Sequence, residues 1–197
     1  MKEKNTQKTT KKSVIKRTSK DCAYIAVFSA LLIAAQLCFA FIPGVEIVTV
    51  LFIAYSFTFG VKRGALAAVA FSLLRQLVFG FFPKVLVLYL LYYPMLALLF
   101  GYLGSKVKSP ARALWWLTLT ACICTVFFTM IDNILTPLWD AYTMEAAKAY
   151  FFASLPTMLS QVICTATTVA VLFLPLERVF RLAKFEKRGA KIDKNSP

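Results

Sequence analysis

The chain consists of long apolar runs separated by short polar segments. The first run, residues 24–41, contains no charged residue and ends just before Pro43 and Gly44. An uncharged run of this length matches the hydrocarbon thickness of a bilayer, so it predicts a membrane-spanning helix that breaks at the proline. Five further runs follow at residues 45–59, 64–81, 85–104, 114–137 and 152–174. We therefore predict an all-α membrane protein, a bundle of six transmembrane helices.

Two basic segments flank this transmembrane domain, which we place at residues 21–182. Residues 1–20 carry eight Lys or Arg among Ser, Thr and Asn. This composition cannot bury an apolar face and is typical of a disordered arm. Residues 183–197 form a basic C-terminal tail. A basic arm before an apolar run is similar to a signal peptide, but this run is longer than the usual apolar region of such a peptide and five more runs follow, so we predict a retained first span.

The basic residues are distributed asymmetrically between the two sides of the predicted bundle. Of the 23 Lys and Arg residues, all but Arg75, Lys84 and Lys148 lie in residues 1–20, after the last apolar run at residue 174, or in the loops on the same side as both chain ends. Loops rich in Lys and Arg stay in the cytoplasm. The pattern therefore predicts a multi-pass protein of the cell membrane with both termini cytoplasmic.

Composition agrees with this class. Hydrophobic residues make up 59% of the chain and mean hydropathy is +0.70, whereas soluble domains contain about 45–50% apolar residues. A net charge of +14 would suit a nucleic-acid-binding protein, but the charges lie in the tails and short loops. We therefore expect contact with anionic membrane lipid and none with nucleic acid.

A small set of polar side chains interrupts the apolar runs. In the predicted topology all of them lie in the outer half of the bilayer: Glu46, Arg75, Gln76, Asp132, Asn133 and Gln161. Ionisable groups inside a bilayer are costly and usually face the bundle interior or a water-filled cavity. Aromatic residues such as Tyr92 lie toward the same side, and ligand pockets combine apolar and aromatic walls with a few polar groups. We expect these residues and Tyr92 to form a substrate-binding pocket open to the outside.

All of these polar residues except Gln76 also have a structural interpretation. Arg75 could form an ion pair with Asp132 or Glu46. Glu46 could cap the second helix, where a carboxylate suits the helix dipole, and Gln161 could join helices through interhelical hydrogen bonds. Asp132 and Asn133 lie near a helix end, where water can solvate them. The residues alone leave both interpretations open.

Three alanines, Ala26, Ala30 and Ala34, repeat every four residues in the first run. This spacing places them along one side of a helix. Small residues at such spacing let two transmembrane helices approach closely. The alanines are therefore candidates either for internal packing or for docking to a partner helix.

Several kinds of chemistry leave no trace in the sequence. The chain has no histidine, and its five cysteines show no zinc-site spacing. It also lacks a Walker A loop, a nucleophile elbow and an HExxH motif. We expect no metal site, no cofactor, no ATP binding through a Walker A loop and no enzymatic activity.

Three stretches resemble those of a known family. The first is the Ala-x-x-x-Ala pair formed by Ala26 and Ala30. The second covers residues 42–68, where a turn and the second span lead into a Gly-x-x-x-Gly connection at Gly60 and Gly64. The third closes the last span at residues 172–180. With six predicted spans and a basic arm, most of residues 25–182 resembles the substrate-binding S component of an energy-coupling factor (ECF) vitamin transporter.

The resemblance implies a protein that binds cargo and has no activity of its own. Such a subunit of an ABC importer binds a vitamin or related small-molecule micronutrient from outside, in a pocket in the outer half of the membrane. It then docks to a transmembrane coupling subunit that two cytoplasmic ATPases drive, and it topples to release the cargo inward. By this resemblance Ala26 and Ala30 are docking positions, and Ala34 extends their stripe.

Two other classes of function remain. One is a non-transport scaffold protein with several spans in the bacterial cell envelope, which would need no ligand. The other is an intramembrane enzyme or a self-contained secondary transporter, although transporters of that kind show duplicated halves that this sequence lacks. The ligand is equally open, since the candidate residues suit a flavin, a pyridine derivative, an indole or a pterin.

Overall fold

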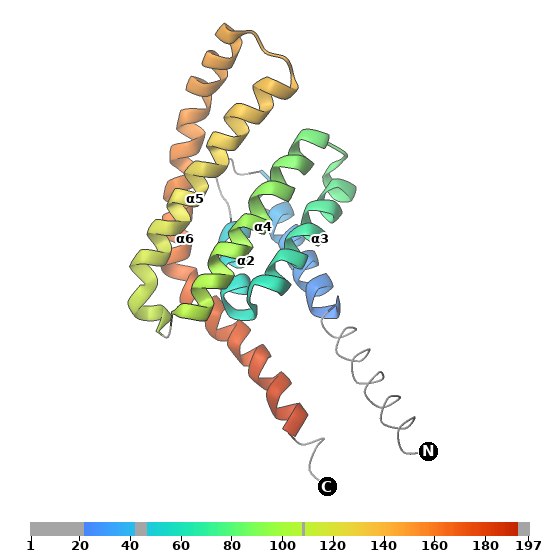
Figure 1. Cartoon of the computed structure of the whole chain (residues 1–197), viewed down its shortest axis with the longest axis vertical. Coiled ribbons are helices and arrows are strands. Elements are labelled where there is room, and N and C mark those ends of the chain that lie inside the picture. The colour runs from blue at the N-terminus through green and yellow to red at the C-terminus, as the bar shows by residue number, and fades with distance from the viewer. Residues whose placement is uncertain (1–21, 42–46, 108, 193–197) are drawn as a thin grey trace.

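Six α-helices make up the part of the chain that the computed structural model describes, which is residues 22–41, 47–107 and 109–192, with side chains described as far as residue 184. The helices are the N-terminal helix Cys22–Phe39, α2 (Ile47–Phe59), α3 (Val61–Phe79), α4 (Pro83–Lys106), α5 (Pro110–Trp139) and α6 (Met144–Ile192) (Figure 1). The prediction of an all-α protein with six helices is confirmed.

Four of these helices are long and apolar enough to cross a membrane: Cys22–Phe39, Pro83–Lys106, Pro110–Trp139 and the Met144–Lys184 part of α6. The chain is thus a multi-span helical membrane protein. The other two helices differ from these four. α2 has 13 residues, and α3 contains the basic residues Lys62, Arg63 and Arg75. That these two also span the membrane stays a prediction.

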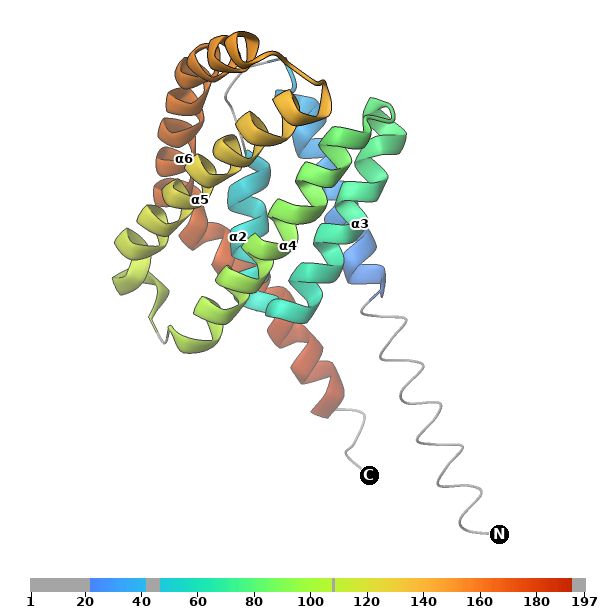
Figure 2. The same ribbon diagram turned by 45° about the horizontal axis from the view of Figure 1, so that its top comes forward.

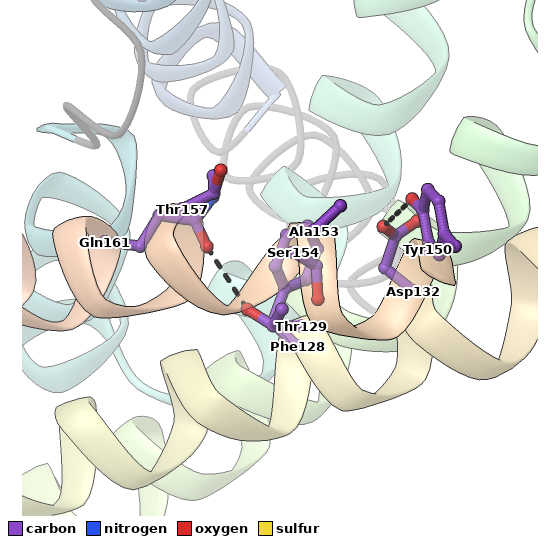
Figure 3. A pocket seen from close by; sticks show the side chains of 8 residues that line it. All are labelled: Phe128, Thr129, Asp132, Tyr150, Ala153, Ser154, Thr157 and Gln161. Carbon is purple, nitrogen blue, oxygen red and sulfur yellow. Dashed lines mark hydrogen bonds between the residues drawn. The ribbon is translucent and has the colours of Figure 1, made fainter. Parts of the chain in front are cut away.

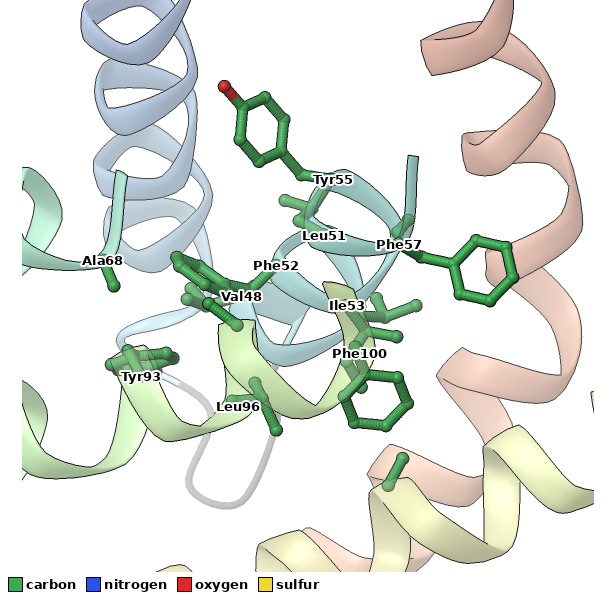
Figure 4. Packing of buried hydrophobic residues seen from close by; sticks show 14 of the residues in the cluster. Val48, Leu51, Phe52, Ile53, Tyr55, Phe57, Ala68, Tyr93, Leu96 and Phe100 are labelled. Carbon is green, nitrogen blue, oxygen red and sulfur yellow. The ribbon is translucent and has the colours of Figure 1, made fainter. Parts of the chain in front are cut away.

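The short helix α2 is the centre of the packed core. Every residue of α2 from Val48 to Thr58 is buried, and the helix packs against α3, α4 and α6 (Figure 4). A helix that is apolar all round is stable only when other elements surround it. Thirteen residues span about 20 Å, less than the roughly 30 Å of a bilayer core. The shortness of the second apolar run therefore reflects its central position in the bundle.

The bundle has two different ends. The α3–α4 turn at residues 80–82 and the α5–α6 turn at residues 140–143 lie at one end, whereas the first residues of the N-terminal helix and the last of α6 lie at the other (Figures 1 and 2). We call the part near the turns the hairpin half and the part near the chain ends the terminus half.

Glycines allow a sharp turn in the terminus half. Gly60 alone separates α2 from α3, and its φ of 85° lies in the left-handed region that favours glycine. One turn later, a Cβ on Gly64 would lie only 2.6 Å from the Ser56 Oγ. The Gly-x-x-x-Gly connection seen in the sequence thus lets α3 fold back tightly against α2.

The last helix is longer at both ends than its apolar run. α6 begins at Met144 and continues to Ile192, so only residues 140–143 connect it to α5, and most of the predicted C-terminal tail is helical. Residues 144–149 are Met, Glu, Ala and Lys, all good helix formers. Hydropathy identifies the membrane-embedded part of such a helix but not its polar extensions. The predicted N-terminal arm, residues 1–20, lies outside the described residues.

Candidate ligand-binding site

Helix α6 is packed in the terminus half and open in the hairpin half. Four of its residues are buried in the bundle: Thr165, Val169, Phe173 and Glu177. None of residues 144–164 is buried. In the terminus half α6 contacts α2, for example through the ring of Phe173, which meets the Phe57 ring edge-on at 5.3 Å. The loss of burial along α6 indicates where the bundle opens.

A pocket of about 250 Å³ lies between α5 and α6 in this open region (Figure 3). Its lining is Phe128, Thr129 and Asp132 from α5, and Tyr150, Ala153, Ser154, Thr157 and Gln161 from α6. Only Phe128 and Ala153 of this set lack a polar side-chain atom. The pocket therefore offers hydrogen-bonding groups along most of its wall.

Two hydrogen bonds hold the carboxylate of Asp132 in place. The Tyr150 hydroxyl donates to Oδ2 at 2.8 Å (Figure 3). The Thr136 hydroxyl donates to Oδ1 at 3.0 Å. A carboxylate has about four acceptor positions on its two oxygens, so Asp132 keeps capacity for a ligand. No basic side chain lines the pocket, and among the described residues no salt bridge reaches Asp132.

A polar pair closes the inner end of the pocket. The Thr129 hydroxyl donates to Oε1 of Gln161 at 3.2 Å. One turn further into the bundle, the hydroxyls of Thr125 and Thr165 lie 3.0 Å apart, and both residues are buried. These short side chains let α5 and α6 approach and hydrogen-bond across the interface. These pairs therefore join the two helices below the site, and the Tyr150–Asp132 hydrogen bond joins them again at its other end.

An aromatic wall places the pocket on the α4 side of the α5–α6 pair. The Phe128 ring, which lines the pocket, lies 4.7 Å from the Tyr92 ring and 6.2 Å from the Tyr89 ring of α4. Tyr92, predicted as a site residue, is buried behind Phe128 and supports the wall without lining the pocket.

Arg75 lies among aromatic rings. Its guanidinium carbon is 5.0 Å from the centre of the Phe79 ring and 4.6 Å from that of Tyr89. Its buried Nε and Nη1 atoms have no hydrogen-bond partner in the described part of the chain. Among the described residues Arg75 forms no salt bridge with Asp132, so the Arg75–Asp132 ion pair offered as a structural interpretation is not formed. Glu46, the other proposed partner, lies outside the described residues.

The two predicted amides, Gln76 and Asn133, behave differently from Gln161. Oε1 of Gln76 accepts a hydrogen bond from the Phe82 backbone N–H at 2.8 Å, which fixes the α3–α4 turn, whereas its Nε2 is buried without a partner among the described residues. Asn133 is buried, and neither polar atom of its side chain has a partner there. Neither residue lines the pocket.

Sequence reasoning missed several residues of this region. Tyr150, Ser154 and Thr157 line the pocket with Gln161, and all four share the helical spacing of one face, which was a usable signal. Gln36, in the uncharged first run, donates from Nε2 to the Tyr89 hydroxyl at 3.3 Å. Gln161 was predicted because it is a lone amide in an apolar run. Gln36 is also a lone amide in an apolar run, so the same signal predicts it.

Ala26, Ala30 and Ala34 are exposed on the N-terminal helix. Phe28 and Leu32 of the same helix belong to the buried core. The alanines therefore do not serve internal packing in the described part of the chain. We call these three residues the alanine face.

The described residues contain no group of three or more His, Cys, Asp or Glu side chains that could hold a metal ion. No protein-family model, curated protein or solved structure matches this chain.

Proposed function

We propose that this protein is the substrate-binding S component of an ECF-type ABC importer and binds a small micronutrient in the α5–α6 pocket. The observation that carries this proposal is the change along α6. The helix is packed against the core in the terminus half, and it borders a polar cavity of about 250 Å³ in the hairpin half. A cavity with a carboxylate, hydroxyls, an amide and an aromatic wall has the make-up of a small-molecule site.

The charge distribution supports an outward-facing pocket. Lys62, Lys106 and Arg112 lie at the connections of the terminus half, and the basic end of α6 extends from the same half. Basic segments stay in the cytoplasm. The terminus half therefore faces the cytoplasm, and the hairpin half faces the outside, from which an importer collects its cargo. In this arrangement all six helices lie in the membrane, and the short helix α2 is enclosed by the others.

The alanine face provides the docking surface in this proposal. Ala26, Ala30 and Ala34 are exposed, and small side chains allow close approach of another transmembrane helix. The partner is the transmembrane coupling subunit, which two cytoplasmic ATPases drive. The chain itself performs no catalysis and needs no cofactor, because binding and docking are its whole task.

Native mass spectrometry of the full chain purified from its host tests the proposal. We expect one small molecule bound per chain, and its loss in the Gln161→Leu and Thr129→Val variants, whose side chains meet inside the pocket. Thr167→Val is the matched control, since Thr167 is exposed and bonds only to the carbonyl of Ile163 on its own helix. It should retain the compound.

A folded chain that retains no compound, and whose thermal stability no vitamin or related micronutrient changes, would contradict the proposal. It would favour the alternative of a multi-span scaffold protein. Co-purification with a transmembrane subunit and an ATPase pair is the second readout. A bulky residue in the alanine face, as in Ala30→Leu, should remove those partners and leave the bound compound in place.

A further inference from the structure

The α5–α6 pocket lies between two hydrogen bonds that join its helices. Tyr150 bonds to Asp132 at one end, and Thr129 bonds to Gln161 at the other. These bonds are three residues apart on α5 but eleven residues apart on α6. Pro156 lies midway along that part of α6, and a proline inside a helix bends it by removing a backbone hydrogen bond. The helix therefore takes a longer path past the pocket than its neighbour does.

The wall of this pocket carries one charge at neutral pH, the carboxylate of Asp132. The other lining side chains are apolar, hydroxyl or amide groups. The two hydrogen bonds to Asp132 come from the neutral hydroxyls of Tyr150 and Thr136, so they do not compensate its charge. Acceptor positions remain on both of its oxygens. The pocket is therefore anionic and can still accept hydrogen bonds from a ligand.

The cations of the hairpin half do not pair with Asp132 in the described part of the chain. The guanidinium of Arg75 lies against aromatic rings outside the pocket. Lys84 pairs with Asp140 at 2.7 Å at the rim of this half, and Lys148 is exposed on α6. A carboxylate among membrane helices is costly unless a cation or water balances it. A cationic ligand would supply the positive charge that the pocket lacks.

Two aromatic rings stand beside the carboxylate. Phe128 lines the pocket one helical turn before Asp132 on α5, and the Tyr150 ring carries the hydroxyl that bonds to Oδ2. Aromatic faces attract a cation, and the rings of a ligand pack well on them. At the other end, Thr129 and Gln161 present neutral polar groups. The pocket therefore has an anionic, aromatic end and a neutral, polar end.

We propose that the cargo is a small organic cation, a ring-bearing amine whose ammonium group binds the carboxylate of Asp132. Its ring lies against Phe128, and its other end faces the Thr129–Gln161 pair. This inference rests on the proposed function. A pocket of about 250 Å³ is smaller than the roughly 300–1,000 Å³ of sites for drug-sized ligands, so it fits an amine with one ring or a fused pair of rings.

Matched probes test the inference on the unmodified protein. Phenethylamine, phenethyl alcohol and phenylacetate share one ring and are positive, neutral and negative. Tryptamine, tryptophol and indole-3-acetate form the same series on a fused ring. Isothermal titration of the full chain in detergent should show at least one amine binding about 10- to 100-fold more tightly than its alcohol and its acid. Amines that bind no more tightly than their alcohols or acids would overturn the inference.

Substitutions of single carboxylates assign the preference to Asp132. Asp132→Asn keeps the size of the side chain and removes its charge, so the amine should bind no more tightly than its alcohol. Asp132→Glu keeps the charge and should retain part of the preference. Glu145→Gln is the matched control, because it removes an exposed carboxylate from the first turn of α6. It should retain the full preference. A full preference in folded Asp132→Asn, or its loss in Glu145→Gln, would overturn the inference.

The outcomes separate this inference from the proposed function. If the amines fail but the purified chain retains a neutral or anionic compound from its host, the inference fails and the proposed function stands. If an amine binds through Asp132 but no coupling subunit or ATPase pair co-purifies, the amine site stands and the proposed importer role fails. If the folded chain binds no probe and retains no compound, both fail.

Discussion

The two halves of the bundle contain the same helices but are built for different tasks. In the terminus half, rings from three helices pack together: Phe28 stacks on Tyr55 at 3.8 Å, and Phe180 meets Tyr55 edge-on at 5.9 Å. The buried carboxylate of Glu177 pairs with Arg181 on the next turn. In the hairpin half, buried polar groups of Arg75, Gln76 and Asn133 have no partner among the described residues, whereas in the terminus half the unpaired buried groups include the small hydroxyls of Ser29 and Ser56.

This difference indicates that the terminus half stabilises the fold and that the hairpin half binds the ligand. Buried polar atoms in a folded protein are nearly always paired. The unpaired guanidinium and amide groups lie in the half that contains the pocket, which favours this half as the place of a ligand. The terminus half has a continuous apolar core that holds the helices while the hairpin half stays open. Stability and binding should therefore respond to different substitutions.

Removal of a core ring in the terminus half should have the largest effect. Phe173 is fully buried, and its replacement by Ala should cost about 3–5 kcal/mol of unfolding free energy, because it leaves a cavity against Phe57. Reversible unfolding in mixed micelles measures this change. Phe152→Ala on the same helix is the control, since its ring is 66% exposed. Equal losses in both variants would contradict the division into halves.

A change of charge in the pocket should affect binding and leave stability nearly unchanged. Asp132→Asn keeps the shape of the side chain but removes the negative charge, so affinity for the retained compound should fall by about 1.5–3 kcal/mol, the range for a hydrogen bond to a charged group. Ligand titration of the purified chain measures the affinity. An unchanged affinity in the folded variant would place Asp132 among the structural residues.

The junction between the halves should be of intermediate importance. Thr125→Val removes the hydroxyl that meets Thr165 at 3.0 Å between α5 and α6. Interhelical hydrogen bonds in membranes contribute about 0.6 kcal/mol on average and up to about 1.7, so we expect a loss of stability in that range. Thr120→Val, which removes a hydroxyl bonded only to its own helix, should change stability less. A larger loss in Thr120→Val than in Thr125→Val would contradict the role of the junction.

The rim of the hairpin half should matter least. The Lys84–Asp140 pair is about one-third exposed on both sides, and exposed pairs contribute about 0.2–1 kcal/mol. Lys84→Gln should lower unfolding free energy by that amount at low salt. The difference should vanish at high salt, because ions screen exposed charges. A loss that persists in 1 M salt would show that the pair holds the two turns together more strongly than its exposure indicates.

Apolar runs were enough to predict the helices, but not how the helices are arranged. The apolar runs predicted the number and order of the six helices. The central position of α2 depends on which helices surround it, and only the shortness of its run pointed to it. The full length of α6 was missed because Glu145 and Lys148 place residues 144–149 outside the apolar run, although all six residues are good helix formers.

The site was predicted in part. Asp132 and Gln161 were found because charged and amide groups are rare in apolar runs. Thr129, Ser154 and Thr157 were missed because hydroxyl residues are common in membrane helices and often bond to their own backbone, as Thr120 does. Only the approach of α5 to α6 distinguishes Thr129 from Thr120. The aromatic rings around Arg75 likewise come from two different helices and cannot be paired from one sequence.

The central claim is that the hairpin half binds cargo which the chain alone neither moves nor alters. Proteoliposomes that contain only this protein, supplied with the compound it retains on purification, test this claim most directly. We predict binding of about one molecule per chain and no accumulation of the compound in the vesicle lumen. Accumulation inside the vesicles, or conversion of the compound to a product, would contradict the account.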